Sequence, residues 1–397
     1  MSTTRVATVA TAMLLLVTAC APSAPDPSRP EATSAPPTVS TPSRTPGRSP
    51  ASRTPTGASP EQTSTGSEQT SASPGSDGTP SGGSVSRVVA VSIDGLNPHA
   101  ITELGPSGAP AFHRLMREGA YTLDARTERE QTRTLPNHTG MLTGRRIDAR
   151  RGGHGVTYNQ DARSRTVHRS AGEYVSSVFD VVHDHGGRTA LFATKTKFDL
   201  YQRTWNTHGQ PDRVGADDGN AKIDEFVVDT NDNRLVATTN AYLREQPGEF
   251  VFLHIALPDE IGHEDGFMSD RYLAGVRATD WLVGTVLDTI SSRPALRRET
   301  VVLLTADHGG DGSSHSDEDE MENYQIPFLA WGPGVPAGRD LYSLNDTRRR
   351  PGTARTTYDG PQPIRNGDLA NLATDVLGLP MVPGSELDAD QDLVISS

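Results

Sequence analysis

Short runs of apolar, largely β-branched residues alternate with amphipathic stretches from residue 87 onwards. Strands are predicted over residues 88–93, 189–193, 250–257, 301–306 and 327–331. These runs are almost continuously apolar, which is typical of parallel strands covered on both faces. Helices are predicted between them, over residues 110–118, 174–184, 233–245, 270–290 and 367–377, with Asp270 as an N-cap. This alternation predicts a doubly wound α/β sandwich around a mostly parallel sheet.

The N-terminal residues have a different pattern. Arg5 precedes a mostly apolar run over residues 6–17, as in a secretory signal. The run is too short for a transmembrane helix, which needs about 20 residues. Residues 17–20 (VTAC) resemble the lipobox of bacterial lipoproteins, in which the cysteine is lipidated. We therefore interpret residues 1–20 as a lipoprotein signal peptide, with Cys20 as the anchor to the extracytoplasmic side of the cell membrane. An ordinary signal peptide is the alternative.

Residues 21–86 are predicted to form a disordered linker. Pro, Ser, Thr and Gly occupy 46 of these 66 positions, and the segment holds no aromatic residue and no Leu, Ile or Met. Such a segment cannot bury enough apolar surface to offset the entropy lost on ordering. The chain is therefore divided into a signal peptide (1–20), a linker (21–86) and one folded domain (87–397).

Composition and charge exclude several classes of function. The formal net charge is −13, and all of it arises after residue 86. A dedicated binder of nucleic-acid polymers would need a basic surface instead. The single cysteine, Cys20, rules out an internal disulfide framework and a zinc site built from cysteines. All 12 histidines lie in the predicted folded domain.

Three of the predicted strands run into an acidic residue. These acids are Asp94, Asp259 and Asp307. The carboxyl ends of parallel strands share one edge of a sheet, and ligands bind at that edge. Three carboxylates placed together repel one another unless a cation lies between them. A single strand-terminal Asp is ordinary turn chemistry, but three of them indicate a cation site.

Histidines accompany two of these acids. His263 lies four residues after the second acid, and His308 and His315 lie one and eight residues after the third. Mixed Asp and His ligands suit zinc, with manganese or iron as competitors. Together these residues exceed what one tetrahedral ion needs. We therefore expect a pair of divalent ions that holds both the attacking and the leaving oxygen of a displacement reaction.

The segment 132–138 (TRTLPNH) carries a candidate nucleophile. Pro136 suits the first turn of a helix. Thr134 would then lie just before a helix N-terminus, where free N–H groups attract an anion such as phosphate. A threonine hydroxyl is a poor nucleophile that coordination to a metal can activate. The alternative is that Thr134 is merely a capping residue.

Taken together and in order, these motifs resemble the type I phosphodiesterase/nucleotide pyrophosphatase branch of the alkaline phosphatase superfamily. The matching motifs are 91–96 (VSIDGL), 132–138, 154–156 with Asn159, 258–259 with 262–263, 305–310 (TADHGG), and His315 with 332–334 (GPG). The resemblance covers about residues 88–380. It implies an alkaline-phosphatase-like α/β/α sandwich and two divalent metal ions, with zinc as the expected metal.

The resemblance also implies a role for each matching residue. The implied ligands are Asp94, Asp307 and His308 for one ion, and Asp259, His263 and His315 for the other. The first ion would also hold the hydroxyl of Thr134, which would attack phosphorus and form a phosphothreonine that water then releases. Asn159 would help to hold a non-bridging phosphate oxygen. The stretch 144–154 is a few residues longer than usual in the family.

The expected activity is hydrolysis of a small phosphoric ester by an extracytoplasmic phosphodiesterase or nucleotide pyrophosphatase. A phosphomonoesterase on the same scaffold is the main alternative. It needs extra positive groups for the third charged oxygen of its substrate, which Arg145, Arg146 or Lys197 would supply. Otherwise Lys197 and Lys195 are interpreted as solvated loop residues.

Two further functions are less favoured. A sulfatase of this superfamily needs a Cys or Ser where this chain has Thr134. A non-catalytic binding module on the cell surface would be expected to have lost metal ligands, whereas all six candidate ligands are present.

Overall fold

The computed structural model describes residues 85–215, 217–245 and 247–396. In this part of the chain eight strands form one sheet, in the order β4-β3-β5-β1-β6-β7-β2-β8. Along the chain the strands are β1 (Arg87–Ile93), β2 (Ala120–Arg126), β3 (Thr189–Ala193), β4 (Glu225–Val228), β5 (Phe250–Ile255), β6 (Thr300–Thr305), β7 (Gln325–Trp331) and β8 (Arg339–Asp340). Cys20, the signal peptide and residues 21–84 of the predicted linker lie outside the described residues.

The sheet is mixed and mostly parallel. The central strand β1 pairs in parallel with β5 on one side and with β6 on the other. Strands β3 and β4 continue the parallel order beyond β5. Only β7 runs in the opposite direction, because it is antiparallel to both of its neighbours, β6 and β2. The predicted α/β fold class with a mostly parallel sheet is therefore confirmed.

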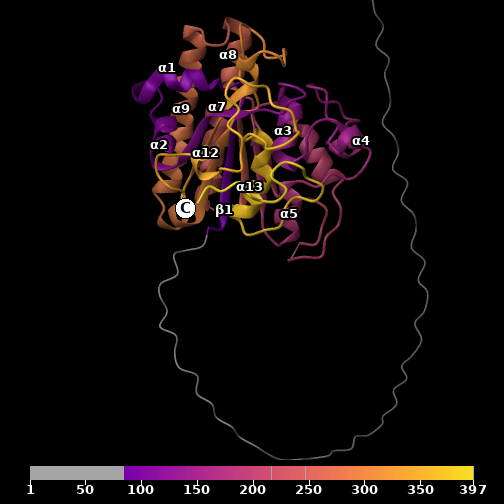
Figure 1. Ribbon diagram of the computed structural model, residues 1–397. Coiled ribbons are helices and arrows are strands. Elements are labelled where there is room, and N and C mark those ends of the chain that lie inside the picture. Colours follow the sequence, from indigo (N-terminus) through magenta and orange to yellow (C-terminus); the bar gives the residue numbers. More distant parts are fainter. Residues whose placement is uncertain (1–84, 216, 246, 397) are drawn as a thin grey trace, which may run out of the picture. The chain divides into compact units, whose positions relative to one another are not determined.

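Helices cover both faces of this sheet (Figure 1). On one face α13 packs on β1 and β6 and contacts α3 and α5, while on the other α7, α9 and α2 pack together. The helices are α1 (Pro98–Gly108), α2 (Pro110–Glu118), α3 (Thr134–Thr143), α4 (Val167–Ala171), α5 (Val178–Asp184), α6 (Asp199–Tyr201), α7 (Asp232–Glu245), α8 (Leu257–Asp265), α9 (Asp270–Ser291), α10 (Pro294–Glu299), α11 (Met321–Tyr324), α12 (Leu341–Leu344) and α13 (Leu369–Val376). No helix of the described residues is both long enough and apolar enough to span a membrane.

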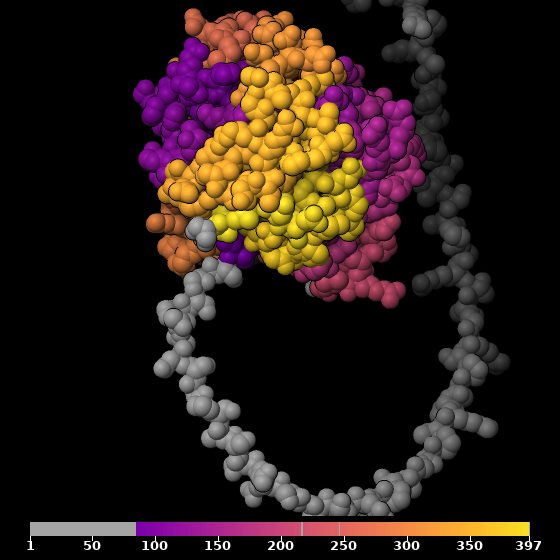
Figure 2. All heavy atoms as spheres, in the orientation of Figure 1, coloured from indigo at the N-terminus to yellow at the C-terminus, as the bar shows by residue number. Residues whose placement is uncertain are grey.

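A segment near the C-terminus, residues 385–387, is hydrogen-bonded both to α13 and to the residue that follows α3. The side-chain amide of Asn371, on α13, donates to the Leu387 carbonyl at 2.7 Å and to the Ser385 hydroxyl at 2.9 Å. The Gly144 carbonyl, just after α3, accepts the N–H of Leu387 at 2.8 Å. This segment is drawn in yellow on the surface in Figure 2. It therefore ties α13 to α3, which carries Thr134.

All five predicted strands are present, but some boundaries differ from the prediction. Strands β2, β4 and β8 were not predicted. Of these, β4 is only half-buried and β8 has two residues, so neither of the two has a long apolar run. Helix α5 begins at Val178, four residues later than predicted, behind the capping box of Ser177. The prediction of Asp270 as an N-cap is wrong. Ser269 caps α9 by accepting the N–H of Tyr272, and Asp270 lies in the first turn.

A buried carboxylate replaces the missing cap of α2. This helix follows Ala109, which has no side chain to accept a hydrogen bond. Asp280 of α9 accepts the N–H groups of Ala111 at 3.1 Å and Phe112 at 2.7 Å instead. The Asp280 side chain is buried, so its removal leaves donors without a partner. The contact therefore fixes α2 on α9 as well as the start of α2.

We expect Asp280→Ala to lower the free energy of unfolding by about 1–3 kcal/mol, because two buried N–H groups lose their acceptor. Urea unfolding followed by circular dichroism measures this loss. Asp288→Ala is the matched control on the same helix. The Asp288 side chain is 79% exposed and pairs with Arg114, so its loss should cost less than about 1 kcal/mol. Equal losses in the two variants would contradict the capping role.

Candidate active site

The three predicted acids lie together at the carboxyl edge of the parallel strands. Asp94 follows β1 directly and Asp307 comes two residues after β6. Asp259 lies in the first turn of α8, which follows β5, and not in a loop. His263 lies one turn further along the same helix. All three carboxylates are buried.

Glycine allows the end of β1 to approach α8. Gly95 has a φ of +67°, and a Cβ at this position would lie 3.0 Å from the Cα of Asp259. A side chain here would therefore be strained and would also push α8 away. This close approach brings Asp94 and Asp259, which are far apart in the sequence, to the same site.

The first cluster joins Asp94, Asp307 and His308. The Nε2 atom of His308 lies 3.3 Å from Asp94 Oδ1 and 3.3 Å from Asp307 Oδ2. All three side chains are fully buried. The three ligand atoms are close enough together to hold one metal ion.

The second cluster joins Asp259, His263 and His315. Asp259 Oδ1 lies 3.4 Å from Nε2 of His263 and 3.6 Å from Nε2 of His315. The two Nε2 atoms are 3.1 Å apart. The clusters adjoin, because His308 Nε2 lies 3.9 Å from Asp259 Oδ1. His308 thus also groups with Asp259 and His315.

One oxygen of each carboxylate is already bound from outside the two clusters. Asp94 Oδ2 accepts hydrogen bonds from Lys195 Nζ at 2.6 Å and from His254 Nε2 at 3.0 Å. Asp259 Oδ2 accepts from the same Lys195 ammonium at 2.5 Å. Asp307 Oδ1 accepts two backbone N–H groups, at 3.0 and 3.1 Å. These contacts fix the orientation of the three carboxylates.

The three histidines are oriented in the same way. Each places Nδ1 against a backbone carbonyl oxygen, so Nδ1 carries a proton and Nε2 is the atom that faces the clusters, where it can bind an ion once it is free of a proton of its own. The carbonyl acceptors are Ser313 for His263 (3.0 Å), Gly309 for His308 (2.9 Å) and Thr132 for His315 (2.5 Å). Such a bond on the outer nitrogen is typical of histidines that bind metal ions.

Four of the atoms that face into the clusters have no hydrogen-bond partner among the described residues. Asp94 Oδ1, Asp259 Oδ1, Asp307 Oδ2 and His308 Nε2 are buried without a hydrogen bond to any described residue. Leaving buried lone pairs unpaired costs free energy. Divalent cations between these atoms would satisfy them, and the mixture of carboxylate oxygen and imidazole nitrogen suits zinc. The residues therefore fit a pair of divalent ions.

The electrostatics of the site also call for added positive charge. Burial, and then the neighbouring Asp94, raise the pKa of Asp307 well above its usual value. Burial would also raise the pKa of Asp94, but Lys195, His254 and His308 together hold it well below its usual value. Burial lowers the pKa of His308, but Asp307 and Asp94 outweigh it and raise this pKa to about 9. Without bound ions, protons and Lys195 supply the charge that the carboxylates require.

Thr134 and Asn159 lie beside these clusters at the start of α3. Thr134 is the first residue of α3 and is buried, while Arg133 is in the N-cap position, so Thr134 is not a capping residue. Nδ1 of His138 donates to the Thr134 carbonyl at 2.8 Å and lies 3.5 Å from Asp307 Oδ2. Asn159 Oδ1 accepts the N–H of Leu135, the residue after Thr134, at 3.0 Å. The first turn of α3 thus connects both residues to the first cluster.

Two residues that contact the predicted ligands, Lys195 and His254, were not predicted to belong to the site. The interpretation of Lys195 as a solvated lysine is wrong, because its ammonium bridges Asp94 and Asp259. A sequence signal existed: the chain has three lysines among its 37 basic residues, and two of them, Lys195 and Lys197, follow one strand. His254, which binds Asp94, was also missed. Its signal is a histidine inside the otherwise apolar run of β5.

We expect His254→Leu to weaken binding of zinc about 10–100-fold, because Asp94 loses a partner that orients it. Calorimetric titration of the metal-free chain with zinc measures this change, and circular dichroism checks the fold. His168→Leu is the control. Like His254, which accepts the Thr194 N–H through Nδ1, His168 on α4 accepts a backbone N–H through Nδ1 and donates through Nε2, but its partners, Val175 and Thr204, belong to neither cluster. A normal zinc affinity in His254→Leu would contradict this role.

Comparisons with solved structures agree with the fold described above. Solved structures of similar fold include murine ectonucleotide pyrophosphatase/phosphodiesterase 5, determined as an inactive variant in complex with AMP. It is 14% identical, with a TM-score of 0.55 over 77% of this chain and 99% of that one. The human enzyme of the same name is 13% identical, with a TM-score of 0.54 over 78% and 100% of the two chains. At these identities the likeness shows the fold alone.

Two curated relatives are GPI ethanolamine phosphate transferases 1. The protein from Yarrowia lipolytica is 28% identical over 174 residues, which are 41% of this chain and 18% of that protein. The protein from Schizosaccharomyces pombe is 28% identical over 134 residues, which are 31% and 14% of the two chains. This chain therefore matches less than a fifth of either relative.

The sequence profile of one family matches most of the folded part of the chain. The family is described as type I phosphodiesterase/nucleotide pyrophosphatase, and the match covers residues 88–327. This range includes Thr134 and both candidate clusters. The chain therefore belongs to the type I phosphodiesterase/nucleotide pyrophosphatase family.

Proposed function

We propose that this protein is a metal-dependent phosphoric-ester hydrolase of the phosphodiesterase/nucleotide pyrophosphatase type, with Thr134 as its nucleophile. One observation carries the proposal. Two adjoining clusters of Asp and His side chains, all of them buried except His263, lie beside the first turn of α3, and four of their ligand atoms are buried without a hydrogen-bond partner among the described residues. Family membership supports this class of reaction. Asp94, Asp307 and His308 are proposed to bind one ion, and Asp259, His263 and His315 the other.

The proposed reaction has two displacements at phosphorus. Two divalent ions, when bound, neutralise the charge on the phosphoryl oxygens and favour ionisation of the attacking hydroxyl. The Thr134 oxygen forms a bond to phosphorus while the bond to the leaving oxygen breaks, and the leaving group takes up a proton. Water then attacks the phosphothreonine, the bond to the Thr134 oxygen breaks, and the hydroxyl is restored. The sum is an ester and water converted to an alcohol and a phosphate.

The start of α3 and Asn159 are proposed to hold the phosphoryl group. The N-terminus of α3 directs the positive end of its dipole toward an anion beside Thr134. The Oδ1 atom of Asn159 is occupied by the Leu135 N–H, so its Nδ2 group is available as a donor to a phosphate oxygen. Donors that are fixed in advance stabilise the charge that develops in the transition state.

We expect Thr134→Ala to lower kcat for bis(p-nitrophenyl) phosphate by more than about 1,000-fold, because no other hydroxyl would replace the nucleophile. The variant should still bind two zinc ions per chain, as measured by elemental analysis. Thr134→Ser keeps the hydroxyl and is the matched control, with turnover well above that of the alanine variant. Unchanged turnover in Thr134→Ala would show that another group attacks phosphorus.

We also propose that the enzyme is a lipoprotein on the extracytoplasmic side of the cell membrane. The proposal rests on residues 17–20 and on the composition of residues 21–86, which would space the catalytic domain from the membrane.

Cys20→Ser tests this location in the native host. We expect the wild-type chain to incorporate an alkyne-labelled fatty acid and to sediment with membranes, and the variant to do neither, because lipidation needs the thiol. Ser23→Ala, three residues further on, is the control and should behave like the wild type. Labelling of the Cys20→Ser variant would contradict the anchor.

A further inference from the structure

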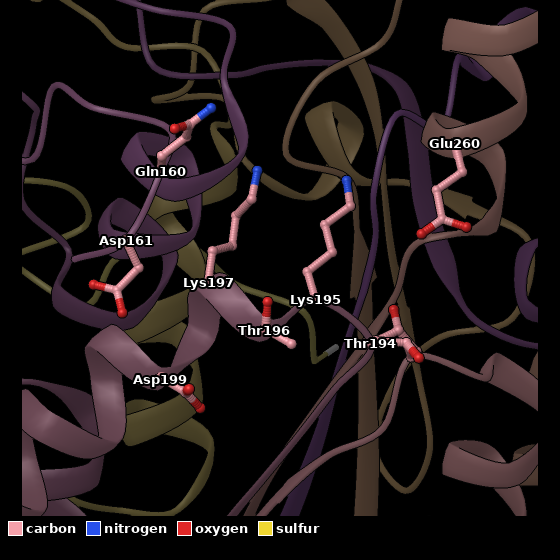
Figure 3. Close-up of a pocket in the computed structure, with 9 residues that line it drawn as sticks. Gln160, Asp161, Thr194, Lys195, Thr196, Lys197, Asp199 and Glu260 are labelled. Atoms are coloured by element: carbon pink, nitrogen blue, oxygen red, sulfur yellow. The ribbon is translucent and has the colours of Figure 1, made fainter. Parts of the chain in front are cut away.

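A pocket of about 570 Å³ opens beside the two clusters of Asp and His side chains. Its lining includes the two lysines that follow β3, Lys195 and Lys197, together with Gln160 and Glu260. Figure 3 shows both lysine side chains extending in the same direction, with Gln160 near the end of Lys197 and Glu260 on the side of Lys195. The pocket thus presents two ammonium groups from one short segment, and its lining also includes the carboxylates of Asp161, Asp199 and Glu260.

The two ammonium groups differ in how their charge is balanced. Lys195 lies between two carboxylates, Asp94 and Asp259. Lys197 forms no ion pair with any described residue. The polar atom that it contacts is the neutral Oδ1 of Asn159, at 3.3 Å. Burial, and then the neighbouring Lys195, lower the pKa of Lys197 below its usual value. An anion near Lys197 would relieve both of these unfavourable effects.

The position of Lys197 places it next to the proposed site of the phosphoryl group. Asn159 Oδ1 accepts from both Lys197 and the N–H of Leu135. Leu135 follows the proposed nucleophile, Thr134, in the first turn of α3. The ammonium is therefore one side chain away from the N-terminus of α3. It is therefore placed to reach an oxygen of a phosphoryl group at Thr134 and not a part of the substrate remote from phosphorus.

The other cations considered for this role point elsewhere. Arg145 donates to Glu173 at 2.7 Å, and Arg146 donates to Glu130 at 2.8 Å and stacks on Tyr358. Neither arginine lines the pocket. Of the three cations that the sequence offered for a third phosphoryl oxygen, only Lys197 remains.

We propose that Lys197 binds the third charged oxygen of a phosphoryl group, so that the site accepts phosphoric monoesters in addition to diesters. A diester has two non-bridging oxygens that share one negative charge, whereas a monoester dianion has three that share two. An ammonium group beside the third oxygen therefore favours the monoester. This inference rests on the proposed hydrolase function and extends it to the charge of the substrate.

Two substrates with the same leaving group test the proposal on the zinc-loaded full chain. They are p-nitrophenyl phosphate, a monoester, and methyl p-nitrophenyl phosphate, a diester. We expect Lys197→Met to lower kcat/KM for the monoester about 10–100-fold more than for the diester, because only the monoester loses a charged hydrogen bond. Lys197→Arg should restore part of the preference. Arg163→Met removes the same charge from an exposed loop residue and should leave the ratio unaltered.

An equal effect on both substrates in Lys197→Met would overturn the proposal. A larger effect on a diester whose second alcohol carries a carboxylate would also overturn it, since Lys197 would then bind a remote anion. If the wild-type chain cleaves neither substrate, the proposed hydrolase function fails. The lysine is then tested by calorimetry with inorganic phosphate, in Thr134→Ala with and without Lys197→Met. At least tenfold weaker binding in the double variant supports the role of Lys197, and equal binding contradicts it.

Discussion

The architecture of the site depends on the repulsion between carboxylates that the fold buries together. Asp94, Asp259 and Asp307 come from three parts of the chain, and β1, β5 and β6 bring them to one edge of the sheet. Buried carboxylates at this spacing need positive charge between them. In each ligand side chain, one carboxylate oxygen or Nδ1 is bound to a group outside the clusters. The other carboxylate oxygen or Nε2 must therefore face into the clusters. The orientation of the clusters therefore follows from the hydrogen bonds that surround them.

Much of this site was predictable because the topology of a parallel sheet is simple. Acids that follow parallel strands must lie at the same edge of the sheet. The proximity of Asp94 to Asp307 was therefore predictable once the two apolar runs before them were interpreted as parallel strands. The position of Asp259 on a helix was not predictable in the same way, because Pro258 is compatible with both a turn and a first helical turn. The contacts of Lys195 were also unpredictable. They depend on the direction of a long side chain across the edge, which no periodicity encodes.

The two lysines after β3 have different partners. Lys195 lies between two carboxylates and helps to fix their outer oxygens, whereas Lys197 contacts Asn159 and forms no ion pair with any described residue. The third lysine, Lys222, is buried against Asp184 and Asp212, well away from the site. Arginine supplies the other 34 basic residues. A compact ammonium fits between closely spaced carboxylates better than a planar guanidinium does, which gives a physical reason for lysine at positions 195 and 222.

Anomalous scattering at the zinc edge, measured on crystals of the zinc-loaded full chain, locates the bound ions. We expect two peaks about 3.5–4 Å apart. One should lie about 2.0–2.2 Å from ligand atoms of Asp94, Asp307 and His308, and the other at the same distances from those of Asp259, His263 and His315. Absence of both peaks, or peaks that lie beside other side chains, would show that these six residues do not hold a pair of ions.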